Sequence, residues 1–212
     1  RWMVEAGSPY PLVGGGYKAL RRFLIEETER LVAAKDLIIV AGPTGAGKTD
    51  VMGAVDNSVD LEGLANHRGS SFGRRLGDQP TQIDFENNLS VRLMKVADVF
   101  GGPVFVEDES RRIGNLELPS ILADKMADAP TVLIDEPLEE RVEIIHRDYV
   151  TGMHTEYEEA YGEEGSGEHG AFLLAALYRI RKRLGGARYQ EIDALMQQAL
   201  ELQEETGSDD AH

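Results

Sequence analysis

The sequence contains no cysteine among its 212 residues, which excludes disulfide bonds, thiolate metal sites and a cysteine nucleophile within this chain. No apolar run approaches the roughly 18 to 20 residues that a membrane-spanning helix needs. The start of the chain also lacks the basic segment, short apolar stretch and cleavage site that are typical of a secretory signal. We therefore expect a cytoplasmic protein with no membrane partner.

Basic side chains are scarce, because 22 lysine and arginine residues face 38 acidic ones, for a formal net charge of −16. Taken alone, this charge argues against a nucleic-acid partner, since Lys and Arg supply most of the non-specific affinity for phosphate backbones. The excess is uneven, and 22 of the acidic residues lie after residue 112. Within this part, the segment 148–168 holds seven carboxylates and no Lys or Arg, which predicts a solvated, mobile excursion rather than an acidic binding site.

Short apolar runs rich in Ile and Val alternate with helical patterns along the first part of the chain. The predicted strands are 37–41, 58–61, 103–107 and 131–135, and the predicted helices are 17–34, 82–99, 137–150, 171–184 and 188–205. This alternation predicts an α/β fold, a P-loop NTPase-like, mostly parallel sheet flanked by helices, with a helical C-terminal region. The 42% hydrophobic composition suffices for one globular domain plus an appendage. The first residue is Arg1 rather than methionine, so we expect the chain to begin inside a longer or processed protein.

The segment 42–49 matches the phosphate-binding (P-loop) pattern G-x-x-x-x-G-K-[ST], and it follows a predicted strand and opens a helix. Its residues are Gly42, Pro43, Thr44, Gly45, Ala46, Gly47, Lys48 and Thr49. In such a loop, backbone N–H groups and the helix N-terminus turn toward an anion, Lys48 meets the outer phosphate oxygens, and the Thr49 hydroxyl holds Mg²⁺. The alternative is an ordinary glycine-rich turn, which the flanking strand and the Lys-Thr pair disfavour.

Carboxylates at the end of a neighbouring strand can complete a Mg²⁺ site. Two groups qualify, namely Glu107, Asp108 and Glu109 after the strand at 103–107, and the pair 135–136 after the strand at 131–135. We prefer the first group, because three carboxylates at a strand end are costly unless a cation or arginines lie close. The sequence thus predicts Lys48, Glu107, Asp108 and Glu109 as catalytic residues and Thr49, Glu107 and Asp108 as Mg²⁺ ligands. A plain strand-ending acid remains an alternative for each group.

A second polar loop, 60–74, follows the strand at 58–61 and should emerge at the same edge of the sheet as the phosphate loop. The residues 79–82 mark the start of the next predicted helix, and Gln82 and Glu86 share one face of this helix. The candidates for binding a second anion or a substrate are Asp60, Glu62, His67, Arg68, Ser70, Ser71, Arg74, Gln82, Glu86 and Arg111. An equally open interpretation makes this segment a polar surface loop in which His67 is merely hydrogen-bonded.

Three blocks of sequence, in this order and at this distance from the phosphate loop, are more specific than the loop itself. They are 59–73, then 79–82 with 85–87, and then 106–111 with 113–114. Together they closely resemble the tRNA 2-selenouridine synthase family. The resemblance covers nearly the whole chain, fades after about Thr151 and returns weakly at 184–188.

The resemblance implies a domain order, an activity and a set of partners. In that family a rhodanese-like domain with a catalytic cysteine precedes the P-loop domain, and 14–20 looks like the closing segment of the rhodanese-like unit. We therefore expect residues 1–34 to be the tail of that domain, 35–205 to be the P-loop domain and 206–212 to be a disordered tail. The catalytic cysteine is then expected upstream of Arg1, which would leave this chain inactive alone.

The activity implied by the resemblance is the replacement of sulfur by selenium in 2-thiouridine at the wobble position of tRNA. It proceeds through a geranylated intermediate and uses geranyl diphosphate and selenophosphate, and the resemblance does not decide which of them occupies the phosphate loop. Other readings of the sequence are a P-loop small-molecule kinase or NTPase, and a module that only binds a phosphorylated ligand. A basic cluster near the C-terminus is open to three interpretations, namely a nucleotide lid, a tRNA contact or a solvated helix face. Its residues are Arg179, Arg181, Lys182 and Arg183.

Overall fold

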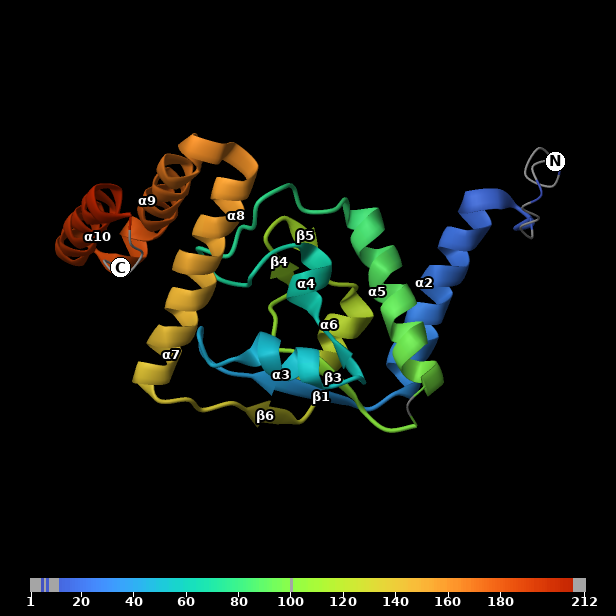
Figure 1. Cartoon of the computed structure of the whole chain (residues 1–212). Coiled ribbons are helices and arrows are strands. Elements are labelled where there is room, and N and C mark those ends of the chain that lie inside the picture. The colour runs from blue at the N-terminus through green and yellow to red at the C-terminus, as the bar shows by residue number, and fades with distance from the viewer. Residues whose placement is uncertain (1–4, 6, 8–11, 100, 208–212) are drawn as a thin grey trace.

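The computed structural model describes residues 5, 7, 12–99 and 101–207 and shows an α/β fold (Figure 1). Its centre is a four-stranded sheet in the order β2-β3-β1-β6, in which every neighbouring pair is parallel. The strands are β1 (Leu37–Ala41), β2 (Ser58–Val59), β3 (Val104–Glu107) and β6 (Thr131–Leu133). The predicted mostly parallel sheet flanked by helices is therefore confirmed.

The two central strands carry the most buried residues of the sheet. Leu37 of β1 pairs with Val104 of β3, and Val40 pairs with Glu107, so both strands end at the same edge. The second strand is shorter than predicted, because the Asp60 side chain accepts a hydrogen bond from Gly63 N at 2.7 Å. This cap begins the short helix α4 (Leu61–Ala65), so Leu61 starts a helix instead of ending a strand.

Helices α2 (Gly16–Ala34) and α5 (Gln82–Val99) pack against each other on one side of the molecule. The buried face of α5 consists of Phe85, Leu89, Ser90, Leu93 and Val96, as the helical period predicts. Helix α2 contributes residues to the same core as the sheet, so the predicted tail of a preceding domain packs here as part of this unit. The domain boundary at residue 34 stays a prediction.

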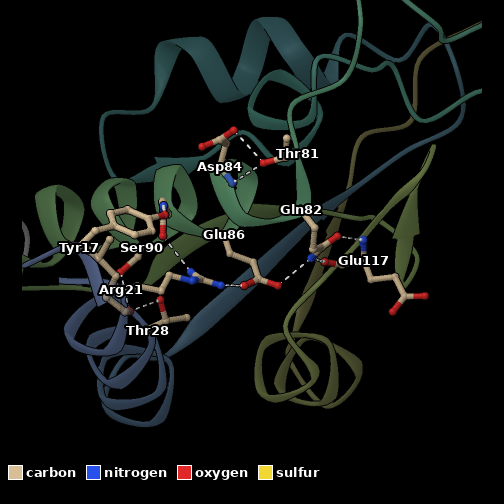
Figure 2. A network of polar contacts seen from close by, with 11 residues as sticks. Tyr17, Arg21, Thr28, Thr81, Gln82, Asp84, Glu86, Ser90 and Glu117 are labelled. Atoms are coloured by element: carbon tan, nitrogen blue, oxygen red, sulfur yellow. Dashed lines mark hydrogen bonds and ion pairs between the residues drawn. The ribbon is translucent and has the colours of Figure 1, made fainter. Parts of the chain in front are cut away.

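A polar network joins α2, α5 and β5 (Figure 2). Arg21 of α2 forms a salt bridge with Glu86 of α5, and Gln82 donates to Glu86 Oε1 at 2.8 Å. Gln82 also exchanges hydrogen bonds with the backbone of Glu117, with distances of 2.8 and 3.0 Å. These side chains therefore fix the position of α5 relative to its neighbours.

The sequence did not predict the segment between β3 and β6. It contains a two-stranded hairpin of β4 (Arg112–Ile113) and β5 (Leu116–Glu117), followed by α6 (Ser120–Ala127). Gly114 in the hairpin turn has φ +61°, a left-handed conformation that favours glycine. Gln79 closes the turn, since its Oε1 accepts from Asn115 N at 2.7 Å and its Nε2 donates to Ile113 O at 3.0 Å.

The rest of the described chain is helical, which confirms the predicted C-terminal region without strands after residue 137. We call α7 to α10 together with the short helices between them the C-terminal helices. They are α7 (Leu138–Ile145), a π-helical segment (His146–Thr151), α8 (Gly152–Tyr161), a 3₁₀ turn (Gly162–Glu164), α9 (Gly165–Leu184) and α10 (Gly186–Thr206). Figure 1 shows them on the side of the sheet opposite to α2 and α5.

The prediction of a mobile acidic excursion at 148–168 was wrong. The segment is helical, and Met153 and Tyr157 are buried one turn apart on the same face of α8. His169 of α9 is also buried, and its ring lies 5.4 Å from that of Tyr157. Carboxylates occupy the outward faces of these helices and mask the apolar positions in the amino-acid composition. Composition alone therefore led to the wrong prediction of a mobile segment. Of the predicted disordered tail, Thr206 ends α10, whereas 208–212 lie outside the described residues.

Across the part of the chain that the structure describes, no helix combines the length and the apolar character needed to traverse a lipid bilayer.

Candidate functional site

The phosphate loop connects β1 to α3 (Lys48–Ala54), which is the strand–loop–helix arrangement that the sequence predicts. Gly45 and Gly47 have φ of +80° and +75°, which side chains rarely adopt. A Cβ atom on Gly42 would lie 2.9 Å from the carbonyl oxygen of Ile134, so this glycine permits close approach to the segment after β6. The Lys48 ammonium donates to the Gly42 carbonyl at 2.8 Å and therefore lies across the loop.

A cavity of about 490 Å³, which we call the loop cavity, opens above this loop. It brings together the phosphate loop, the second polar loop, the end of β3 and the first C-terminal helices. Apart from residues 42–50, its lining consists of Glu62, Arg68, Gly69, Ser70, Arg75, Glu107, Asp108, Glu109, Ser110, Ile144, Arg147, Asp148 and Tyr149. The predicted meeting of the two loops at one edge of the sheet is therefore observed.

Two arginines that line the loop cavity, Arg68 of the second polar loop and Arg75 just after this loop, carry unpaired donors. Arg68 Nη1 and Arg75 Nε are buried and have no hydrogen-bond partner among the described residues. The Arg68 guanidinium lies over the Tyr149 ring, 5.3 Å from its centre, and Tyr149 OH lies 3.0 Å from Ser70 Oγ. Buried donors without acceptors are costly, and an anion in the cavity would satisfy them.

Glu107 is the most buried carboxylate of the loop cavity, with 1% of its surface exposed. Its Oε2 accepts a long hydrogen bond from Glu62 N at 3.4 Å, and its Oε1 has no partner among the described residues. Burial, followed by repulsion from Glu62 and Asp60, raises the pKa of Glu107 to about 8. Burial and a hydrogen bond with Glu62 raise the pKa of Glu109 to about 8 as well. Both side chains therefore hold protons at neutral pH, which reduces the negative charge of the cavity.

A metal ion in the loop cavity would take most of its coordination from water and ligand. Within the described residues, no three His, Asp or Glu side chains are grouped so that they could enclose a metal. Mg²⁺ is commonly held by one or two carboxylates plus phosphate oxygens, and the unpaired Oε1 of Glu107 is a suitable oxygen for it. Asp135 follows the neighbouring strand but does not line the cavity, whereas Glu107, Asp108 and Glu109 do.

The family model described as the tRNA 2-selenouridine synthase AAA domain matches residues 35–212. The chain belongs to the tRNA 2-selenouridine synthase family. Proteins named tRNA 2-selenouridine synthase from Marinobacter nauticus, Alcanivorax borkumensis and Pseudomonas aeruginosa are 50%, 48% and 49% identical to it over 100% of the chain. The chain spans 58%, 59% and 58% of the lengths of these relatives. No solved structure matches the chain.

In this member of the tRNA 2-selenouridine synthase family, six of the ten predicted second-anion residues line two neighbouring cavities. Glu62, Arg68 and Ser70 line the loop cavity. A second cavity of about 500 Å³, which we call the polar cavity, is lined by His67, Ser70, Ser71, Arg74, Gly77, Asp78, Gln79, Gly114, Asn115 and Arg179. Burial is the main cause that lowers the pKa of His67, so its imidazole is neutral at neutral pH.

Four of the predicted second-anion residues line neither cavity. Gln82 and Glu86 belong to the network between α2, α5 and β5 in Figure 2. Arg111 forms a salt bridge with Asp124 of α6, and Asp60 caps α4. Each of these side chains thus has a structural partner, and we leave all four out of the proposed site.

The basic cluster of α9 is likewise divided by its contacts. Arg179 lines the polar cavity and donates to the Ser71 carbonyl at 3.3 Å. Arg181 lies over the Tyr178 ring of its own helix, with its guanidinium carbon 3.7 Å from the ring centre. Neither residue lines the loop cavity, so the structure does not place them as a lid on the phosphate loop.

Sequence reasoning missed Arg75, Arg147 and Tyr149. Arg75 directly follows the predicted Arg74 and could have been included with it. Arg147 forms salt bridges with Asp50 at 3.0 Å and with Asp148 at 2.7 Å, and it closes one side of the loop cavity. Tyr149 and Arg147 lie in the π-helical segment, about 100 residues from the phosphate loop along the chain. No local sequence pattern predicts that residues so distant in the chain line the loop cavity.

Proposed function

We propose that this chain is the phosphate-handling part of a tRNA-modifying selenotransferase. In this proposal, the complete enzyme replaces sulfur by selenium in 2-thiouridine at the wobble position of tRNA, through a geranylated intermediate, with geranyl diphosphate and selenophosphate as co-substrates. Membership of the family supports the tRNA modification. The observation that carries the role of this chain is the pair of arginines with buried, unpaired donors that line the same cavity as the phosphate loop.

The loop cavity is suited to hold a leaving diphosphate. When the sulfur of 2-thiouridine attacks C1 of the geranyl group, a C–S bond forms, a C–O bond breaks and the diphosphate leaves with the electron pair. The N3–H proton of the thiouracil ring is released to solvent. Lys48, the loop N–H groups and Arg68 would stabilise the charge that develops on its oxygens. No ATP hydrolysis is needed for this role, because the co-substrates already carry the phosphoryl groups.

Mg²⁺ is the proposed cofactor at this site. Thr49 and Glu107 would hold the ion with Asp108 beside them, and the ion would offset charge on the bound phosphates. Where no ion is bound, Glu107 and Glu109, whose pKa values are raised to about 8, would instead exchange a proton with a ligand in the cavity. His67 and Arg74 would contact a second anion in the polar cavity.

The proposed partners are a tRNA with 2-thiouridine at its wobble position and a rhodanese-like domain that carries the catalytic cysteine. The chain spans only 58% of the length of its relatives, which leaves room in them for such a domain. Selenium transfer through a rhodanese-type site needs a thiolate that is both nucleophile and carrier, and this chain has no cysteine.

Calorimetry with geranyl diphosphate, selenophosphate and ATP, each with Mg²⁺, tests the proposal. We expect binding of at least one of the two co-substrates, in competition with inorganic diphosphate, and at most weak binding of ATP. Preferential binding of ATP with hydrolysis would favour a P-loop NTPase or kinase instead. Binding of a phosphorylated ligand without any contribution to tRNA modification, when the missing domain is supplied separately, would reduce the chain to a binding module.

A further inference from the structure

A third cavity lies between the second polar loop and the C-terminal helices. Its volume is about 770 Å³, and most of its lining is hydrocarbon from the π-helical segment, α9 and α10. The lining residues are Thr44, Ser70, Ser71, Phe72, Ile145, Tyr149, Val150, Leu173, Ile180, Ile192, Leu195, Met196, Gln198, Ala199 and Leu202. We call this the apolar cavity. Two of its residues, Leu195 and Leu202, remain 60% and 46% exposed, so apolar surface is available for burial by a ligand.

The apolar cavity adjoins the loop cavity. Thr44 of the phosphate loop, Ser70 and Tyr149 line both. The Tyr149 hydroxyl lies 3.0 Å from Ser70 Oγ, and the Tyr149 ring carries the Arg68 guanidinium over one face. A ligand whose anionic group lies on the phosphate loop would pass these three shared residues to reach a hydrocarbon environment.

The chemistry of the two cavities selects the class of ligand. A nucleotide on the phosphate loop would extend a ribose and a base, whose hydroxyl and amide edges need hydrogen-bond partners when buried. The apolar cavity offers few side-chain partners for them, namely Gln198 and the hydroxyls at the shared wall. A saturated or olefinic chain attached to a diphosphate needs none and gains from the apolar area that it buries.

We propose that the apolar cavity binds the hydrocarbon chain of a prenyl diphosphate while its diphosphate occupies the phosphate loop. This inference rests on the proposed function and deepens it, because it assigns the prenyl diphosphate, and not selenophosphate, to the loop. Ser70 lines the loop, apolar and polar cavities together. The carbon that joins diphosphate to chain would lie near Ser70, where an acceptor entering from the polar cavity reaches it.

The test compares geranyl diphosphate, dimethylallyl diphosphate, inorganic diphosphate and ATP by calorimetry on this chain with Mg²⁺. We expect geranyl diphosphate to bind about 100-fold more tightly than inorganic diphosphate, with the shorter chain between them, because each buried methylene adds affinity. Ala199→Trp fills the apolar cavity without removing any of its groups, and it should abolish this preference while leaving affinity for inorganic diphosphate unchanged. Ala194→Trp is the matched control, since Ala194 is exposed on the same helix and lines none of the three cavities.

A second variant, Leu195→Ser, removes an exposed part of the lining and should weaken geranyl diphosphate about tenfold without affecting the fold. Retained binding of inorganic diphosphate shows in each variant that the chain is folded. Equal affinities for geranyl and inorganic diphosphate in the unmodified chain would overturn the prenyl assignment and leave the phosphate role intact. A preference for geranyl diphosphate that persists in both Ala199→Trp and Leu195→Ser would show that the hydrocarbon chain does not bind in the apolar cavity. Absence of binding by every diphosphate would instead overturn the proposed function.

Discussion

Replacement of Glu107 by glutamine should stabilise this chain in the absence of ligand, and the effect should grow with pH. Glu107 is 1% exposed, has an unpaired Oε1 and lies beside other carboxylates. Its pKa is raised from an ordinary value of 4.5 to about 8, mainly by burial. Below pH 4.5 the carboxyl is protonated in both the folded and the unfolded chain, so this residue imposes no penalty there.

As the pH rises above 4.5, the unfolded chain releases the proton while the folded chain keeps it until about pH 8. Each pH unit in this window lowers the free energy of unfolding by about 1.4 kcal/mol. At pH 7 the accumulated loss is about 3 kcal/mol, and Glu107→Gln should recover most of it because the amide carries no charge and can still accept from Glu62 N. The two proteins should therefore have nearly equal stability near pH 4.5.

Urea denaturation at several pH values between 5 and 9, with a chelator to remove divalent cations, measures this difference. Glu136→Gln is the control, since Glu136 follows the neighbouring strand β6 but is exposed. Its free energy of unfolding should follow the unmodified chain at every pH. If Glu107→Gln leaves the slope of stability against pH unchanged, the Glu107 carboxylate is not penalised by burial. Geranyl diphosphate with Mg²⁺ should reduce the difference in free energy of unfolding between the unmodified chain and Glu107→Gln, because an ion bound at Glu107 Oε1 stabilises the charged carboxylate.

Four further outcomes are expected. Lys48→Ala should weaken diphosphate binding about 10- to 100-fold in calorimetry, because it removes a charge-assisted contact from the phosphate loop. The melting temperature should not change, since no core packing is lost. Unchanged affinity for every phosphorylated ligand would contradict the assignment of this loop to phosphate binding. Glu107→Gln should reduce the enhancement of diphosphate binding by Mg²⁺ while Asp135→Asn preserves it, and the reverse result would move the metal to β6. Phe85→Ala should cost about 3 to 5 kcal/mol in chemical denaturation, because Phe85 is a fully buried residue of the hydrophobic core. A loss below about 1 kcal/mol would contradict that packing. Finally, this chain alone, incubated with 2-thiouridine tRNA, geranyl diphosphate and selenophosphate, should yield no 2-selenouridine by mass spectrometry of the digested RNA, and its appearance would refute the need for a cysteine in a separate domain.

The sequence predicted the elements whose residues interact with near neighbours in the chain. Helix α5 was predicted with its observed bounds, because its apolar residues recur at helical spacing and its start is marked at Pro80 and Thr81. The phosphate loop was predicted from its glycines and its Lys-Thr pair, since the backbone conformation of such a loop restricts the residues that it can contain. Because these signals are local, they predict the helix and the loop correctly without information from the rest of the fold.

The contacts that complete the site come from distant segments and were not predictable in the same way. Tyr149 and Arg147 reach the loop cavity only because α7 packs over the phosphate loop, where Arg141 donates to the Thr44 carbonyl at 3.1 Å. The hairpin of β4 and β5 was missed because its strands contain only two residues each, too few to show a period. Composition misled at 148–168, where net charge concealed an amphipathic helix.

The two sides of the site belong to different parts of the molecule, and polar contacts join them across the site. On one side lie the phosphate loop and the second polar loop, and on the other lie the C-terminal helices, held by contacts such as Arg147 with Asp50 and Tyr149 with Ser70. A ligand that spans this seam is thermodynamically linked to the docking of the helices, so each stabilises the other by the same factor. Substitutions in α9 or α10 that loosen the docking will therefore raise the dissociation constant of the ligand without contacting it. Amide hydrogen exchange of these helices will slow as ligand saturates the site.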